Sequence, residues 1–112
     1  MTSNIDMNTF NMLIESTGPE FINELIDTFL DDAPTLLAQM QTALATQDAD
    51  SFRRAAHSMK SNAATFGAME LSTLARELEV FGKEKNLEIG NRLEVMKEAF
   101  RQVEDQLKAL KV

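Results

Sequence analysis

The only histidine of the chain, His57, lies in a segment that contains no acidic residue. Residues 51–69 lack aspartate and glutamate but include Arg53, Arg54 and Lys60, which give the segment a formal charge of +3. The whole chain carries −7, so the remaining residues carry −10. A neutral imidazole is a nucleophile near neutral pH, because its ordinary pKa is about 6.5. A single imidazole among cations in an acidic chain is therefore a candidate carrier of an anionic group.

Helical spacing predicts that the His57 ring is accessible. At about 100° per residue, His57 lies about 140° from Phe52 and Ser61 about 180° from it, so both point outward or lie at the boundary of the core. The apolar stripe on the other side of this helix consists of Phe52, Ala56, Met59, Ala63 and Phe66. Lys60, three residues after His57, is close enough to neutralise a phosphoryl group on the ring. The small residues Ser61 and Ala64 would let another protein's active site approach.

Each of these features also has an ordinary explanation. A single histidine on a helix is usually a surface residue without a special role. Basic residues such as Arg53, Arg54 and Lys60 usually form a solvated face of a helix. The seven methionines are more typical of core filling than of a cofactor site. Ser61 has no neighbouring base that would suggest a catalytic triad. One histidine and no cysteine make a metal site improbable, although a carboxylate-only Mg²⁺ or Ca²⁺ site stays open.

The elements around this segment predict an all-α fold, an antiparallel four-helix bundle with a short extra N-terminal helix. Glycine and proline are sparse, and neither alternating strand patterns nor hairpin turns are visible. We expect helices after the N-cap Asp6, from Pro19 through Pro34 to about residue 45, over 50–66, over 69–82 and over 89–110. At Pro34 we favour one kinked helix over two separate helices, and Gly67 should end its helix in the left-handed conformation.

The inward faces follow from the same spacing. They are Met7, Phe10, Leu13 and Ile14 in the first helix, Phe21, Leu25, Phe29, Leu36, Leu37, Met40 and Leu44 in the second, Met69, Leu71, Leu74, Leu78 and Phe81 in the fourth, and Ile89, Leu93, Met96, Phe100, Val103, Leu107 and Leu110 in the last. With 112 residues, the chain is expected to form one domain over 1–112.

Composition excludes several classes of function. Apolar runs are too short to span a bilayer, and the N-terminus lacks the basic and apolar regions of a signal peptide. A net charge of −7 argues against nucleic acid, which requires a broad basic face. We therefore expect a cytoplasmic protein with no membrane or nucleic-acid partner, and a monomer, since four helices can close a core.

The segment Ala56-His57-Ser58-Met59-Lys60-Ser61-Asn62-Ala63-Ala64-Thr65-Phe66-Gly67-Ala68 resembles the signature of histidine-containing phosphotransfer (HPt) domains. In that family the histidine is followed by any residue, a hydrophobic residue, lysine and glycine, with a further glycine ten residues after the histidine. His57, Met59, Lys60 and Gly67 match this pattern, whereas Ser61 replaces the usual glycine. Residues 29–34, with an interior proline, and the pairs 70–71 and 78–79 are also similar to the family's helices. The resemblance covers about residues 18–110.

The resemblance implies a phosphorelay intermediate. His57 would accept a phosphoryl group, through Nε2, from an aspartate of a receiver domain and pass it to a second receiver. Its partners would be response-regulator receivers and a hybrid sensor histidine kinase. The chain would have no cofactor and no kinase activity of its own, and Mg²⁺ would be bound by the receiver.

The resemblance also assigns roles to the surrounding residues. Lys60 would neutralise the phosphoryl group, and Ser61 would keep the surface open. Glu79 would accept a hydrogen bond from His57 Nδ1–H, or else would be an ordinary solvated residue. The role of Gly67 would be structural, and Arg53 and Arg54, with Ala64, would form the docking surface.

Two other functions stay open at this level. One is a helical bundle that binds signalling partners without accepting phosphate. The other is a dimerisation domain of a histidine kinase, which is disfavoured because Ser58, rather than an acidic residue, follows His57.

Overall fold

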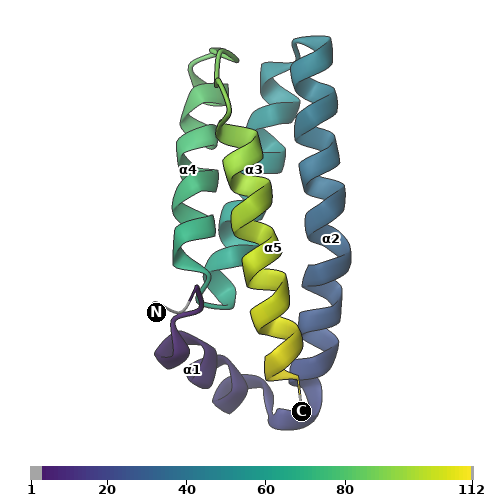
Figure 1. Cartoon of the computed structure of the whole chain (residues 1–112), viewed down its shortest axis with the longest axis vertical. Helices are drawn as coiled ribbons and strands as arrows, with labels where there is room; N and C mark the ends of the chain where they lie inside the picture. The colour runs from purple at the N-terminus through teal and green to yellow at the C-terminus, as the bar shows by residue number, and fades with distance from the viewer. Residues whose placement is uncertain (1–3, 112) are drawn as a thin grey trace.

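The computed structural model describes residues 4–111, and within them five helices are joined by short turns (Figure 1). Their bounds are Met7–Thr17 (α1), Pro19–Thr46 (α2), Ala49–Thr65 (α3), Met69–Lys83 (α4) and Arg92–Leu110 (α5). Helices α2 to α5 run along the long axis of the molecule, whereas α1 lies across one end of the bundle (Figure 1). α3 packs between α2 and α4, and α5 contacts both α2 and α4. The predicted four-helix bundle with an extra N-terminal helix is confirmed.

Two of the helices, α1 and α3, begin at an aspartate whose side chain satisfies a free backbone N–H group. The Asp6 side chain accepts a hydrogen bond from Asn8 N–H, as predicted for an N-cap, and Asp48 accepts one from Ser51 N–H. α2 begins with Pro19 at its first position and continues without interruption through Pro34 to Thr46. The prediction of one helix through Pro34, rather than two, is therefore confirmed, and the kink at Pro34 stays a prediction.

Gly67 has the left-handed conformation predicted for it, with φ of +80°. Its N–H donates to the Ala64 carbonyl, and Ala68 N–H donates to the Ala63 carbonyl, which satisfies the last carbonyl groups of α3. The Gly67 carbonyl in turn accepts a hydrogen bond of 2.8 Å from Asp6 N–H. The turn between α3 and α4 thereby holds the start of α1.

The core follows most of the predicted faces, and no polar side chain of the described residues is buried in it. Its largest fully buried side chains are Phe10, Phe52, Ile5, Ile22, Ile26, Met40, Met59, Leu71, Leu78, Met96, Leu107 and Val103. Tilted and edge-on contacts join Phe29 to Phe66 and to Phe100, linking α2 to the end of α3 and to α5.

Three predicted core residues are wrong. Met7, Phe21 and Met69 are 39%, 52% and 45% exposed. Each lies in the first turn of its helix. Helices α2 and α4 begin at the end of the bundle where α1 crosses (Figure 1). The spacing rule identifies one face of a helix but does not reveal where the partner helix ends.

The predicted start of the last helix at Ile89 is also wrong, because α5 begins at Arg92. Lys85 and Gly90 both have positive φ, so the backbone of residues 84–91 cannot continue as a helix. Ile89 is nevertheless buried and completes the core from the connecting loop. The Arg92 guanidinium lies 4.7 Å from the centre of the Phe81 ring. This cation–π contact joins the end of the loop to α4.

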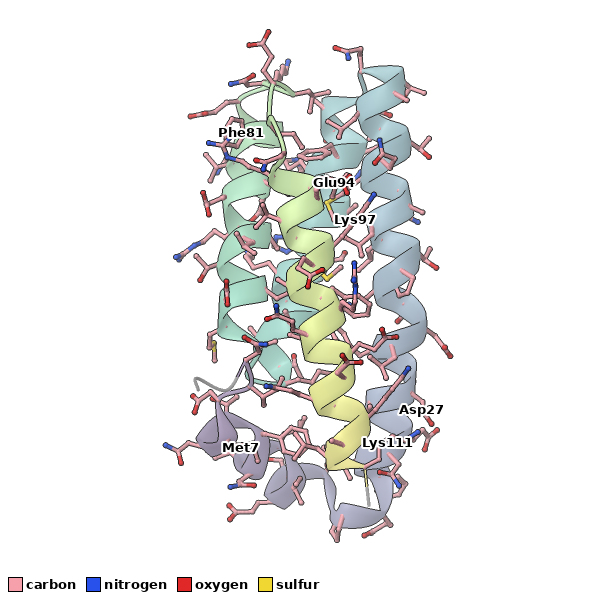
Figure 2. The ribbon with its side chains drawn as sticks, in the orientation of Figure 1. Met7, Asp27, Phe81, Glu94, Lys97 and Lys111 are labelled. Atoms are coloured by element: carbon pink, nitrogen blue, oxygen red, sulfur yellow. The ribbon has the colours of Figure 1, made fainter. Side chains whose placement is uncertain are left out.

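At the opposite end of α5, Lys111 Nζ lies 2.6 Å from Asp27 Oδ1 of α2 (Figure 2). No helix within residues 4–111 has the length and apolarity needed to cross a bilayer.

Candidate functional site: a histidine, a carboxylate and a lysine across two helices

The close approach of α3 and α4 determines the geometry around His57. Gly82 of α4 is buried, and a Cβ atom at this position would lie 2.9 Å from Arg53 Cβ and 3.0 Å from Arg53 Cα and N. Any side chain at position 82 would therefore force the helices apart. Nearer the other end of α4, Ser72 Oγ donates a hydrogen bond of 3.0 Å to the Lys60 carbonyl. These two contacts lie on either side of the site.

Glu79 of α4 bridges the two functional side chains of α3. Its Oε2 atom lies 2.6 Å from His57 Nδ1, and its Oε1 atom lies 2.7 Å from Lys60 Nζ. The Glu79 side chain is 17% exposed and that of Lys60 28%, whereas the His57 side chain is 55% exposed. The carboxylate and the ammonium are thus mostly covered, while the imidazole reaches solvent.

The electrostatics of the cluster keep Glu79 ionised. The hydrogen bond from Lys60 is the largest influence and lowers the pKa of Glu79 below its ordinary 4.5; burial opposes this, and His57 lowers the pKa further. An ionised carboxylate can only accept hydrogen bonds, so His57 Nδ1 must carry the proton in this contact. In the neutral ring, Nε2 then has the lone pair and is the unpaired nucleophilic atom.

Lys60 differs in its surroundings from the sequence-based expectation. The sequence predicts that Lys60 neutralises a phosphoryl group, whereas in the structure its ammonium is already bound to Glu79. Ser61 is exposed one turn from His57, and Ala64 is half-buried on the same helix. Neither residue blocks the ring with a large side chain.

Arg53 and Arg54 lie on the same helix, but both are paired with one acidic residue. Arg53 Nη2 is 3.0 Å from Asp50 Oδ1, and Arg54 Nε is 3.2 Å from Asp50 Oδ2. Asp50 lies just outside the carboxylate-free segment and offsets part of its positive charge. Gly67 lies away from the cluster, at the end of α3, where its role is to close the helix.

Sequence reasoning missed Gly82, Ser72 and Asp50. Gly82 had a signal, because a glycine inside a helical pattern costs about 1 kcal/mol relative to alanine and can be retained for packing. The predicted helix over 69–82 ends at Gly82, whereas α4 continues to Lys83. Ser72 and Asp50 carry no signal of this kind, because polar residues on helices are mostly solvated.

Comparisons with known proteins agree with the helical-bundle fold. The Hpt domain family model matches residues 24–111. Residues of the chain are 33% identical over 75 positions to the sensor protein TorS of Escherichia coli (strain K12), a match that covers 67% of this chain and only 8% of TorS. The crystal structure of histidine-containing phosphotransfer protein B (HptB) from Pseudomonas aeruginosa PAO1 superposes with a TM-score of 0.88 at 27% identity, covering 99% of this chain and 96% of that one.

The chain belongs to the Hpt domain family. It is a phosphotransfer module of two-component signalling, a class whose members carry phosphoryl groups, are not kinases, and interact with receiver domains and kinases. The expectation of a single domain over 1–112 stays a prediction, since the family model begins at residue 24.

Proposed function

We propose that His57 is the phosphoacceptor of this module, and that it takes a phosphoryl group from a receiver aspartate and gives it to a second receiver. The observation that carries the proposal is the half-exposed imidazole whose Nδ1 is held by Glu79, which leaves Nε2 free. A hybrid sensor kinase supplies the first receiver in this scheme. The proposal includes the monomeric state and the cytoplasmic location expected from the sequence.

The chemistry balances with the groups present. The Nε2 lone pair attacks phosphorus in line, the N–P bond forms, and the P–O bond to the receiver aspartate breaks with its electrons returning to the carboxylate. The ring becomes a phosphoimidazolium. Its Nδ1 keeps its proton and donates it in the hydrogen bond to Glu79 throughout the transfer. The reverse sequence loads the second receiver and regenerates neutral His57. Mg²⁺ bound by the receiver stabilises the transferring group, and this chain contributes no metal to the step.

The surrounding residues have three separate roles in the proposal. Glu79 is a positioning residue, which fixes the tautomer and balances the positive ring after phosphorylation. Lys60 shares its ammonium between Glu79 and the incoming phosphoryl oxygens. Ser61 and Ala64 leave space for the receiver, while Arg53 and Arg54 affect the association rate more than the chemistry.

The test uses ³¹P NMR after incubation with a phosphorylated receiver and Mg²⁺. Because the chain contains one histidine, a phosphohistidine resonance in this protein can arise only from His57. We expect this resonance in the wild type and its loss in His57→Gln, with an unchanged circular dichroism spectrum. Full transfer to His57→Gln would refute the assignment. Receiver binding by a wild type that is never phosphorylated would instead support a module that only binds.

A further inference from the structure

The cations that lack a carboxylate partner are gathered in one part of the molecule. All eleven lysine and arginine side chains lie within residues 4–111, and seven of them form ion pairs. The other four belong to α4, to the loop after it and to the first position of α5; they are Arg76, Lys83, Lys85 and Arg92. The Arg92 guanidinium is engaged by the Phe81 ring. Within the described residues, Arg76, Lys83 and Lys85 therefore remain without a partner for their charge.

Arg76 is the unpaired cation that lies beside the His57 segment of α3. It is placed on α4 between Ser72, which donates to the Lys60 carbonyl, and Glu79, which is bonded to the ring. At a rise of about 1.5 Å per residue, Arg76 lies about 4.5 Å from Glu79 along the helix axis. At about 100° per residue, it lies about 60° further around α4, and its side chain is exposed. The long side chain of Arg76 can therefore bend over Glu79 toward the accessible edge of the ring.

Phosphorylation would change the charge of the cluster. Before transfer, the Glu79 carboxylate and the Lys60 ammonium cancel, and the nucleophilic form of His57 is neutral. A phosphoryl group brings about two negative charges and the ring gains one positive charge, so the cluster would change from neutral to about −1. Lys60 can only share its ammonium, because Glu79 already holds it. In a chain of net charge −7, a second cation near the ring would stabilise the phosphorylated form.

We propose that Arg76 is a further phosphoryl-binding residue of this site. Its guanidinium turns toward His57 when the ring is phosphorylated and donates to the phosphoryl oxygens from the α4 side, while Lys60 donates from α3. This inference rests on the proposed function. Arg76 makes and breaks no covalent bond; its charge stabilises the phosphoryl group while the N–P bond forms. Arginine suits this role, because its planar fork can donate two parallel hydrogen bonds to one phosphoryl group.

Lys83 is less well placed for the same role. It lies four residues after Glu79, next to the crossing of Gly82 with Arg53. It therefore lies about 6 Å from Glu79 along the axis, and its neighbour across the crossing is another cation. A lysine also presents a point charge instead of a fork. For these reasons the inference is restricted to Arg76.

The loop after α4 supplies a matched control. Lys85 is exposed and, within the described residues, has no partner for its charge, but it lies two residues beyond the end of α4. Arg76→Gln and Lys85→Gln each remove one positive charge, so both variants have the same net charge. A difference between them cannot come from the overall charge of the protein. Both positions are exposed, so both variants should fold.

The experiment labels the purified chain with phosphoramidate, a small donor that needs no partner protein. His57 Nε2 attacks the phosphorus, the N–P bond to the ring forms, and the bond to the departing ammonia breaks. The second-order rate constant is measured by ³¹P NMR at low ionic strength, where surface charges are least screened. We expect Arg76→Gln to lower it about two- to fivefold, the range of an ion pair at an exposed site. Lys85→Gln should match the wild type, and Arg76→Lys should retain at least about half of its rate constant.

A second measurement separates a charge contact from an effect on structure. The ³¹P chemical shift of the labelled protein is followed against pH. A cation beside the phosphorylated ring favours its deprotonated forms and lowers their pKa, so Arg76→Gln should raise the midpoint of this titration. Lys85→Gln should leave the midpoint at its wild-type value.

The alternative outcomes are distinct. If Arg76→Gln leaves either the rate constant or the titration midpoint unchanged, or if Lys85→Gln changes them as much, Arg76 does not bind the phosphoryl group. If Arg76→Lys loses as much as Arg76→Gln, the charge is not what matters and the inference also fails. Absence of labelling in the wild type, or full labelling of His57→Gln, would overturn the proposed function itself.

Discussion

Removal of the Glu79 carboxylate should change both the stability of the bundle and the tautomer of His57. Glu79→Ala deletes two hydrogen bonds, of 2.6 Å to Nδ1 and 2.7 Å to Lys60 Nζ. Hydrogen bonds to charged groups contribute about 1.5–3 kcal/mol when buried, but partly exposed ion pairs contribute at most about 1 kcal/mol each. Because His57 is half-exposed, we expect the free energy of unfolding to fall by about 1–2 kcal/mol. For a domain of this size that lowers the melting temperature by roughly 4–9 °C.

The effect of Glu79→Ala on the His57 tautomer is a more specific test than its effect on stability. About 1 kcal/mol of preference for Nδ1–H corresponds to about a fivefold tautomer ratio, and Glu79→Ala removes it. Imidazole ¹⁵N NMR measures the ratio directly, because the chain has one histidine. Phosphotransfer to a receiver should slow in parallel, since less of the neutral ring presents a free Nε2.

Glu79→Gln is the matched control for charge. Its side-chain oxygen can still accept from Nδ1–H but cannot pair with Lys60 as an ion. We expect the tautomer to be largely retained while stability falls. An unchanged tautomer ratio in Glu79→Ala would refute the positioning role, whatever happens to the transfer rate.

The lowered pKa of Glu79 also predicts a pH dependence. A carboxyl group whose pKa is lower in the folded state stabilises the protein fully above its ordinary value of 4.5, and this stabilisation is lost as the pH falls through the lowered pKa. The difference in stability between wild type and Glu79→Gln should therefore be constant above pH 4.5 and disappear in more acidic solution. Denaturant unfolding across this range measures it, and a difference that grows as the pH falls would contradict the assignment.

Three further substitutions test individual contacts. Lys60→Ala should slow transfer while retaining the fold, at a cost of about 1 kcal/mol or less, and unchanged single-turnover kinetics would contradict its charge role. Gly67→Val should destabilise by more than 1 kcal/mol, because φ is +80° and a Cβ would lie 2.7 Å from the Asp6 carbonyl oxygen; a melting temperature equal to wild type would exclude this strain. Gly82→Ala gains about 1 kcal/mol of helix propensity but overpacks against Arg53 at a cost of about 1–3 kcal/mol, so we expect a small net loss of stability. We also expect a smaller fraction of the Nδ1–H tautomer, because the added side chain forces the two helices apart. Greater stability with an unchanged ring spectrum would show that α4 can yield there.

The sequence predicted the bundle because apolar spacing and helix caps are local signals. The stripe from Phe52 to Phe66 and the left-handed Gly67 both follow from residues close together in the chain. Errors arose where the answer depended on a distant element. Met69 is exposed because the bundle ends beside it, and Ile89 is buried although it precedes its helix.

The same distinction applies to the candidate site. The outward position of His57 could be predicted from helical geometry alone. The pairing of Lys60 with Glu79, nineteen residues later, depends on the register between α3 and α4. No spacing rule within one helix provides that register. The resemblance to HPt domains suggested Glu79 as a partner of the ring but did not reveal that it also holds the lysine.

The absence of a side chain at Gly82 makes the state of the His57 ring depend on the packing of two helices. With backbone meeting backbone at this crossing, the separation of α3 and α4 is set by rigid atoms rather than by side chains that can rearrange. Glu79 lies three residues before Gly82, so a small separation of the helices would break its short bond to the ring before the core opens. A partly unfolded copy would then lose its preference for the Nδ1–H tautomer early, so that fewer of its rings would present a free Nε2. Under the proposed function, such a copy would transfer phosphoryl groups more slowly before its core opened.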